Sequence, residues 1–244
     1  MQIKSHGIVL TETPYNDRFS IVHILTPKEG CVSYMLPLST ANKSAARNLK
    51  RILYPLSEVH IVAEHRSGRS LQRLIEASPA PLRLSILMQP EKRSIALFLA
   101  DLLHLVLMKQ TDEVLYAFLS NALDELEGAS KGVENFHIAF LVSLLRVVGI
   151  APDRESLGGT DRAWFSLQEA AFVPQPYSDT DIPPQDAGHI VTLLRINYRN
   201  MHLYRYTAIQ RRRIVAALLD FMRFHWIAFP SLKSTEVLSA LYRS

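Results

Sequence analysis

The chain has 244 residues, 48% of them hydrophobic, and a formal net charge of +4, as expected for a soluble globular protein that forms one large domain or two small ones. Its single cysteine, Cys31, excludes an intrachain disulfide and any zinc site built from several cysteines. No signal sequence opens the chain and no apolar run approaches the ~18 residues that span a bilayer, so we expect a cytoplasmic protein that does not contact membranes.

Residues 1–80 are predicted to form about five short β-strands. Runs rich in β-branched and aromatic residues lie at 3–11, 19–25, 31–38, 59–64 and 71–75. Turn sequences such as Thr26-Pro27-Lys28-Glu29-Gly30 and Arg66-Ser67-Gly68-Arg69 separate them. Such a run of short strands favours a small barrel such as the OB-fold, although a small β-sandwich or an SH3-like barrel fits the pattern nearly as well.

From residue 81 onward the spacing of apolar residues changes to that of α-helices. Three helices are predicted: the first begins at Pro90, the second covers Leu115 to Leu126, and the third covers Phe136 to Val148. Because apolar residues surround the first of them, we expect it to be buried nearly all round. Gly149 is typical of a helix C-terminus and ends the third helix.

Residues 150–188 contain five prolines and the pair Gly158-Gly159, and they are predicted to form a loop-rich insertion with a short hairpin around 164–172. Thr207 with Gln210 forms a capping box that predicts the start of a later helix. Strands followed by helices indicate an α+β multi-domain chain. We expect an N-terminal OB-fold barrel at 1–80 and an α-helical domain at 81–244.

Sequence signatures of enzymes are absent. No Walker loop, G-x-G-x-x-G turn, H-E-x-x-H or G-x-S-x-G motif occurs in the chain. His60 and His65 lie close in sequence, but two imidazoles without a carboxylate or thiolate make a poor metal site, so we favour barrel-edge histidines. His137 is predicted to lie at the edge of the core. We therefore expect no catalytic residues, no metal and no cofactor, and an enzyme assembled only in three dimensions is the least favoured hypothesis.

The placement of charge carries the main functional signal. Residues 1–100 have a net charge of +6, residues 101–184 of −8, and residues 185–244 of +6. Basic regions attract phosphate backbones, whereas acidic regions repel them. In the first region seven basic residues lie between the third and fourth strands or around the next turn. We predict that they bind DNA: Lys43, Arg47, Lys50, Arg51, Arg66, Arg69 and Arg73.

Two further sets of residues are candidates for binding. Tyr34 and Tyr54 are candidate stacking platforms for bases, but packing within the barrel is favoured. Arginines near the C-terminus suit bidentate contacts with phosphate or carboxylate, and they are Arg195, Arg199, Arg205, Arg211, Arg212 and Arg213. An acidic peptide tail and a second stretch of DNA are both plausible ligands for this set. We place the pocket for a partner tail near Arg195 and Arg199.

Several segments resemble the RecO family of bacterial recombination mediators. They are Gly7-Ile8-Val9-Leu10, Tyr15, Thr26-Pro27 with Gly30, Phe136 with Leu144-Leu145, Gly149 and Pro152, and Leu232-Lys233-Ser234 with Val237-Leu238. Their order and spacing extend over nearly the whole chain. The resemblance implies an OB-fold joined to a helical domain, and a non-catalytic, nucleoid-associated protein that binds single- and double-stranded DNA. It also implies work with RecR, recognition of the acidic C-terminal tail of single-strand-binding protein, loading of RecA and annealing of complementary strands.

The chain departs from this family in one segment. Many members place four cysteines in the stretch corresponding to about 153–180, where they bind zinc, and this chain has none there. We therefore expect apolar packing to hold the segment, through Trp164, Phe165, Leu167 and Phe172. The main alternative function is a protein-only adaptor whose basic ends bind acidic partners, which the acidic middle region favours.

Overall fold

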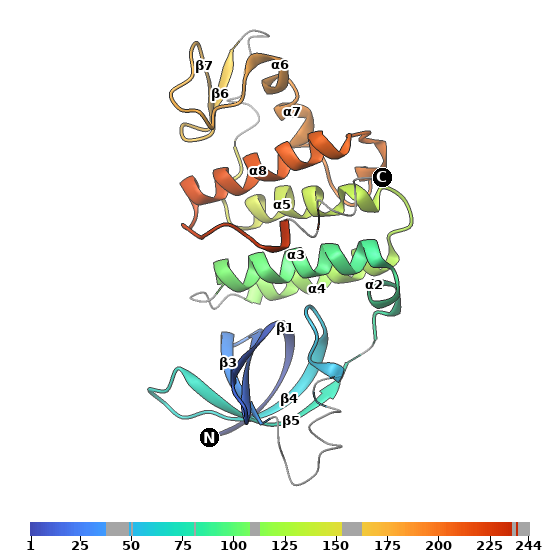
Figure 1. Cartoon of the computed structure of the whole chain (residues 1–244), viewed down its shortest axis with the longest axis vertical. Coiled ribbons are helices and arrows are strands. Elements are labelled where there is room, and N and C mark those ends of the chain that lie inside the picture. Colours follow the sequence, from blue (N-terminus) through green and yellow to red (C-terminus); the bar gives the residue numbers. More distant parts are fainter. Residues whose placement is uncertain are drawn as a thin grey trace. The chain divides into compact units, whose positions relative to one another are not determined.

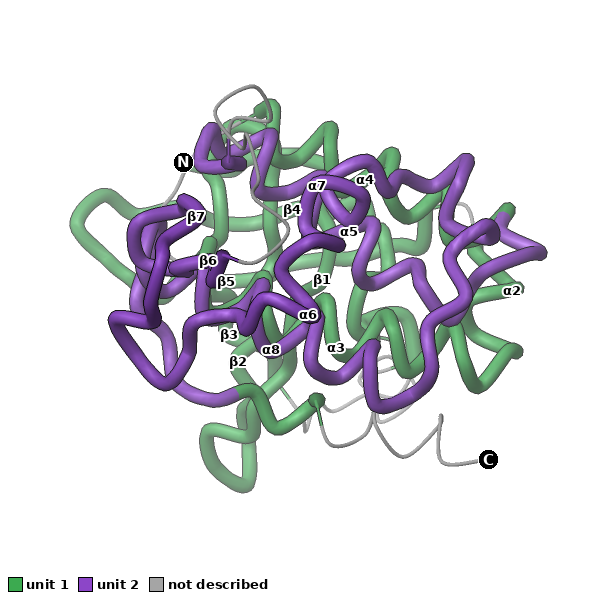
Figure 2. Tube along the Cα trace, turned by 90° about the horizontal axis from the view of Figure 1, so that it is seen from above, with its two compact units in different colours: residues 1–128, 232–241 green, residues 129–231, 242–244 purple. Residues whose placement is uncertain are grey.

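The computed structural model of the protein describes residues 1–37, 49, 51–80, 82–107, 113–152, 163–235 and 238. Internal contacts divide the chain into two compact units, which Figure 2 shows in different colours. The first unit comprises residues 1–128 and 232–241, and the second comprises residues 129–231 and 242–244. The segment that follows Ser231 therefore returns to the first unit.

The first unit begins with a closed barrel of five strands, which curve around one another in Figure 1. The strands are β1 (Gln2–Asn16), β2 (Phe19–Thr26), β3 (Gly30–Pro37), β4 (Glu58–Glu64) and β5 (Leu71–Pro79). They follow the order β1-β2-β3-β5-β4, and β1 pairs with β4 to close the barrel. Neighbouring strands are antiparallel except for β3 and β5, which are parallel. The prediction of an N-terminal OB-like barrel is confirmed.

Alternating apolar side chains fill the interior of the barrel. Val22 and Ile24 of β2 are fully buried, whereas His23 between them is partly exposed, as a period of two requires. Gly7 of β1 lies against this core, because a Cβ atom there would be only 2.3 Å from Cγ2 of Ile24. Glycine in the opening strand therefore lets β1 cross β2 at close range.

The helices of the first unit that are described in full are α2 (Leu84–Met88), α3 (Pro90–Leu107) and α4 (Glu113–Gly128). The buried ammonium group of Lys92 donates hydrogen bonds to Ser85 Oγ (2.7 Å) and to the carbonyl of Glu127 (2.8 Å). The Glu127 carboxylate accepts the backbone N–H groups of Ser85 (2.8 Å) and Ile86 (2.9 Å) at the start of α2. These polar contacts join the three helices to one another.

Arg83 connects the barrel to helix α4. Its guanidinium group forms ion pairs with Glu58 of β4 (3.0 Å) and with Asp124 of α4 (2.8 Å). The hydroxyl of Ser120 on α4 also donates to Glu58, at 2.8 Å. Ion pairs and a hydrogen bond therefore connect the barrel to this helix.

Helix α3 begins at Pro90, as predicted, and it is buried on most sides, although Leu97 is 39% exposed. Asp101 on this helix accepts hydrogen bonds from the hydroxyl (2.7 Å) and the backbone N–H (3.3 Å) of Ser234 in the returning segment. Of the closing segment that resembles the RecO family, Leu232-Lys233-Ser234 and Leu238 are described, whereas Val237 lies outside the described residues. Among the helices that the structure describes, none is both long enough and apolar enough to cross a membrane.

The second unit is built on two helices that contact each other, α5 (Phe136–Val147) and α8 (Ala208–His225). The predicted capping box starts α8, since Gln210 N–H donates to Thr207 Oγ1 (3.2 Å) and Thr207 N–H donates to Gln210 Oε1 (2.8 Å). Gly149 has a φ of 76° just after α5, as expected of a C-terminal glycine. Both predicted helix ends are therefore confirmed.

Shorter elements complete the described part of the second unit. They are η1 (Val133–Asn135), β6 (Trp164–Ser166), β7 (Ala171–Val173), α6 (Pro184–Ala187), α7 (Ile190–Leu193) and η2 (Met201–Leu203). Strands β6 and β7 are antiparallel and form the hairpin predicted at 164–172. Phe165 and Leu167 are buried, and the rings of Phe165 and Phe172 meet edge to face with their centroids 5.3 Å apart. These three residues show the expected apolar packing, whereas Trp164 is partly exposed.

A buried carboxylate also holds this hairpin segment, which the sequence did not predict. Asp181 is 5% exposed and accepts the backbone N–H groups of Leu167 (3.3 Å), Tyr177 (2.6 Å) and Ser178 (3.1 Å). Burial by itself raises the pKa of Asp181, but these hydrogen bonds outweigh burial and lower it. The carboxylate therefore links β6, the loop after β7 and its own turn.

Candidate nucleic-acid interface

A groove on the barrel surface lies beside β3, β5 and the turn between β4 and β5. It has a volume of about 550 Å³ and is lined by Phe19, Met35, Pro37, Glu64, Arg66, Arg69, Leu71, Gln72, Arg73, Leu74 and Ile75. OB-folds bind oligonucleotides on the face of their second and third strands and at the loop between the fourth and fifth. The groove therefore occupies the position at which this type of barrel binds nucleic acid.

The groove combines cationic and apolar side chains. Arg66, Arg69 and Arg73 are exposed, and the structure brings all three of these predicted DNA-binding residues into one site. Phe19 is partly exposed and Ile75 is 50% exposed. Single-stranded DNA binds sites in which cations meet the phosphates and apolar or aromatic groups meet the bases. The chemistry of the groove matches such a strand.

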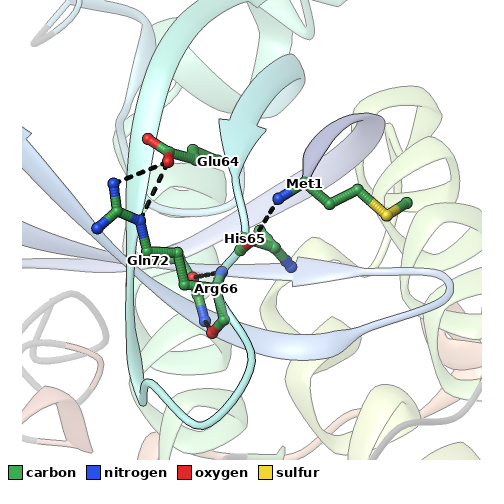
Figure 3. Close-up of polar contacts among 5 residues, drawn as sticks. All are labelled: Met1, Glu64, His65, Arg66 and Gln72. Carbon is green, nitrogen blue, oxygen red and sulfur yellow. Dashed lines mark hydrogen bonds and ion pairs between the residues drawn. The ribbon is translucent and has the colours of Figure 1, made fainter.

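The turn that carries Arg66 and Arg69 is closed by the N–H of Arg69, which donates to the carbonyl of Arg66 at 3.3 Å. Gly68 has a φ of 78°, which L side chains rarely adopt. His65, at the start of the turn, is held through its backbone. Its N–H donates to the Met1 carbonyl, and its carbonyl accepts from the Met1 amino group, each at 2.8 Å (Figure 3). The turn is therefore anchored to the first strand.

Glu64 places a negative charge in the same groove. Its Oε1 accepts hydrogen bonds from Nε (3.0 Å) and Nη2 (2.9 Å) of Arg66, as Figure 3 shows. The hydrogen bond from Arg66, together with its charge, lowers the pKa of Glu64. The Arg66 side chain is exposed and that of Glu64 is partly exposed, so this pair contributes little to stability. A phosphate that binds Arg66 must compete with this carboxylate, which sequence reasoning did not foresee.

Packing, rather than base stacking, is confirmed for Tyr34. Its ring is fully buried, and its hydroxyl lies 3.0 Å from Nε2 of His65. Burial raises the pKa of Tyr34. Tyr54 is half-buried, and burial likewise raises its pKa. The aromatic residue that lines the groove is Phe19, which sequence reasoning missed although it directly follows the turn between the first two strands.

The first predicted basic cluster is largely outside the described residues. Lys43, Arg47 and Lys50 are not described, whereas Arg51 is described and exposed. The structure therefore joins Arg66, Arg69 and Arg73 into one groove and leaves the position of the first cluster a prediction.

Arg195 and Arg199 are both exposed in the second unit, on the segment that follows α7. Asn197 Oδ1 accepts the N–H of Arg199 (3.0 Å), and Asn200 Nδ2 donates to the carbonyl of Arg195 (3.0 Å). These bonds fix the backbone between the two arginines and leave their side chains accessible. Binding of a partner tail at this place stays a prediction.

Among the described residues, the histidines do not converge with further side chains that could bind a metal ion. In the part of the chain that the structure describes, no three histidine, cysteine, aspartate or glutamate side chains form a group that could hold a metal ion. His60 is exposed and its ring lies beside that of His6, with centroids 4.7 Å apart. His137 lies inside the core rather than at its edge, because all but 1% of its surface is covered. Burial, and then the charge of Arg211, lowers the pKa of His137 to about 3.

Comparisons with known proteins identify the family. The family described as Recombination protein O N terminal matches residues 1–82, and Recombination protein O C terminal matches residues 88–226. The DNA repair protein RecO of Porphyromonas gingivalis is 37% identical over 244 residues, which cover 99% of this chain and 100% of that protein. The DNA repair protein RecO of Phocaeicola vulgatus is 33% identical over 242 residues, which cover 98% of each chain. The chain therefore belongs to the RecO family of DNA repair proteins.

Proposed function

We propose that the protein is a non-catalytic recombination mediator that acts in DNA repair by holding single-stranded DNA in the barrel groove. The observation that carries this proposal is the convergence of Arg66, Arg69 and Arg73 on one groove that apolar side chains also line. The guanidinium groups bind phosphates, while Phe19 and Ile75 contact bases. Binding of this kind releases counterions, so the affinity falls as the salt concentration rises.

The family resemblance supports further steps in the proposed mechanism. The protein binds double-stranded as well as single-stranded DNA, works with RecR and helps to load RecA onto strands covered by single-strand-binding protein. It anneals complementary strands when two strands are held on separate basic surfaces with their charges screened. The basic cluster at Lys43, Arg47, Lys50 and Arg51 supplies further phosphate contacts in this proposal.

Fluorescence anisotropy of a labelled single-stranded oligonucleotide at several salt concentrations tests the groove. The triple variant Arg66→Ala, Arg69→Ala, Arg73→Ala should bind on the order of 100-fold more weakly. The negative slope of log affinity against log salt should become less steep by about 2. A matched control removes the same charge from exposed positions of the first unit outside the groove, namely Lys4→Ala, Lys28→Ala and Arg93→Ala. Equal affinities of the two triple variants would show that DNA does not bind in the groove.

A protein-docking role for the second unit is the other candidate. The exposed guanidinium groups of Arg195 and Arg199 on a fixed turn favour it, because such groups bind carboxylates. The proposed ligand is the acidic C-terminal tail of single-strand-binding protein. Titration of a synthetic acidic peptide should show binding that Arg195→Glu with Arg199→Glu abolishes, while Lys131→Glu does not. If no single-stranded DNA binds anywhere, the adaptor alternative takes the place of the mediator.

A further inference from the structure

The turn between β4 and β5 carries two of the three groove arginines, yet its backbone has little support of its own. Pairing of β4 with β5 extends to Glu64 opposite Arg73. Beyond that pair, one long hydrogen bond of 3.3 Å from Arg69 N–H to the Arg66 carbonyl closes the turn. A short exposed turn that contains glycine pays conformational entropy when its side chains are ordered by a ligand. Something else must therefore hold it.

The side chain of Gln72 supplies that support. Its Oε1 accepts the backbone N–H of Arg66 at 2.8 Å. Its Nε2 donates to the carbonyl of Arg69 at 2.7 Å and to the carbonyl of Arg66 at 3.2 Å. In Figure 3 the carboxamide reaches across the turn to the backbone of Arg66. One side chain thus binds backbone groups of both arginines that present their guanidinium groups to the groove.

Glutamine suits these contacts in both chemistry and length. Both an acceptor and a donor are required, and a carboxamide has the two on one planar group. Glutamate lacks the donor and adds a negative charge, asparagine is one methylene shorter, and methionine has the size of glutamine without its hydrogen bonds. The start of the turn is tied down separately, since the ring of His65 meets the buried hydroxyl of Tyr34 and its backbone pairs with Met1.

We infer that Gln72 is a positioning residue for nucleic-acid binding, because it fixes the turn that directs Arg66 and Arg69 into the groove. This inference rests on the proposed function. Its physical basis is preorganisation: when the arginine backbone is already ordered, less entropy is lost as the strand binds. Removing the Gln72 hydrogen bonds should therefore lower affinity through the two arginines and through no other contact.

A double-mutant cycle with a labelled single-stranded oligonucleotide tests this. Gln72→Met alone should weaken binding about threefold to tenfold and flatten the salt dependence, because phosphate contacts are lost. In the background of Arg66→Ala with Arg69→Ala, the same change should have no further effect. Hydrogen exchange of the Arg66 amide should become faster in Gln72→Met. Gln185→Met, at an exposed position of the second unit, is the control and should match the original protein.

Each contrary outcome has a distinct meaning. Equal losses from Gln72→Met in both backgrounds would show that Gln72 contacts DNA directly, which overturns the positioning role. Faster exchange of the Arg66 amide with unchanged affinity would also overturn it, while the arginine variants still support the groove. Unchanged affinity in Arg66→Ala with Arg69→Ala would overturn the positioning role together with the proposed DNA site.

Discussion

The β4–β5 turn and the hairpin segment of the second unit are held in a similar way but differ in burial. Each is a short irregular stretch in which a single polar side chain binds several backbone groups. Gln72 binds them at a partly exposed turn, whereas Asp181 accepts three backbone N–H groups at 5% exposure. Water can reach the Gln72 contacts at this turn, whereas the Asp181 side chain is almost fully buried. Burial therefore decides whether such a side chain orders a binding site or stabilises the fold.

Removal of the Asp181 carboxylate should have the largest effect. Asp181→Ala leaves the N–H groups of Leu167, Tyr177 and Ser178 without their acceptor, so the free energy of unfolding should fall by about 3 kcal/mol. Urea denaturation followed by circular dichroism measures this loss. Asp179→Ala, at an exposed position two residues earlier, should change stability by less than about 0.5 kcal/mol. Similar losses of stability in the two variants would show that the buried Asp181 carboxylate has no special role in the fold.

Acid should weaken the first unit through His23, which faces His104 and has Ser33 Oγ 2.9 Å from its Nδ1. Burial, and then the charge of His104, lowers the pKa of His23 from 6.5 to about 4. The unfolded chain therefore binds a proton at a higher pH than the folded chain. The contribution of neutral His23 is present above pH 6.5 and is lost as the pH falls toward about 4.

Urea denaturation between pH 7.5 and 4.5 checks this expectation. His23→Gln should reduce the slope of stability against pH, whereas His189→Gln, at an exposed position of the second unit, should leave it unchanged. An unchanged slope in His23→Gln would contradict the assignment. Since Asp181 has a lowered pKa, its own contribution should persist to a lower pH than that of His23.

Strain in the exposed turn should have a smaller effect. Gly68 has a φ of 78°, and no described atom lies within 4 Å of the place that a Cβ atom would take, so Gly68→Ala meets no clash and only backbone strain. Stability should fall by about 1 kcal/mol. Gly128→Ala is the matched control, because the space around it is also open and its φ is not positive. If Gly68→Ala lowers the free energy of unfolding as much as Asp181→Ala does, the turn contributes to the stability of the fold and not only to the order of the groove.

Loss of the competing negative charge of Glu64 should have the smallest effect, and it should raise the affinity for single-stranded DNA. Glu64→Gln frees Arg66 from an ion pair of 2.9 Å, so affinity for a single-stranded oligonucleotide should rise about threefold, with a steeper salt dependence. Anisotropy titrations at two salt concentrations measure both quantities. Glu76→Gln, on an exposed position of β5, removes the same charge outside the groove lining and is the control. Weaker binding by Glu64→Gln would show that Glu64 positions Arg66 rather than competing for it.

Local features of the structure were predictable because they depend on residues close in sequence. The five strands, the capping box at Thr207 and the glycine at 149 follow from side-chain period, hydrogen-bonding groups and backbone freedom within a few residues. The clustering of Arg66, Arg69 and Arg73 was also predictable, since all three flank one turn. Strands followed by helices already predicted a barrel and a helical region, and the family resemblance implied the same order.

Contacts between distant segments required the tertiary structure. Phe19 joins the groove arginines only because β3 pairs with both β2 and β5, and no local pattern states that pairing. Asp181 looked like one more acid in an acidic region, yet the fold buries it against three N–H groups. The sequence by itself determined the types of element and the sign of the charge, because both are local properties. Tertiary structure decided which charges meet and which are buried, because register and packing set the distances between segments.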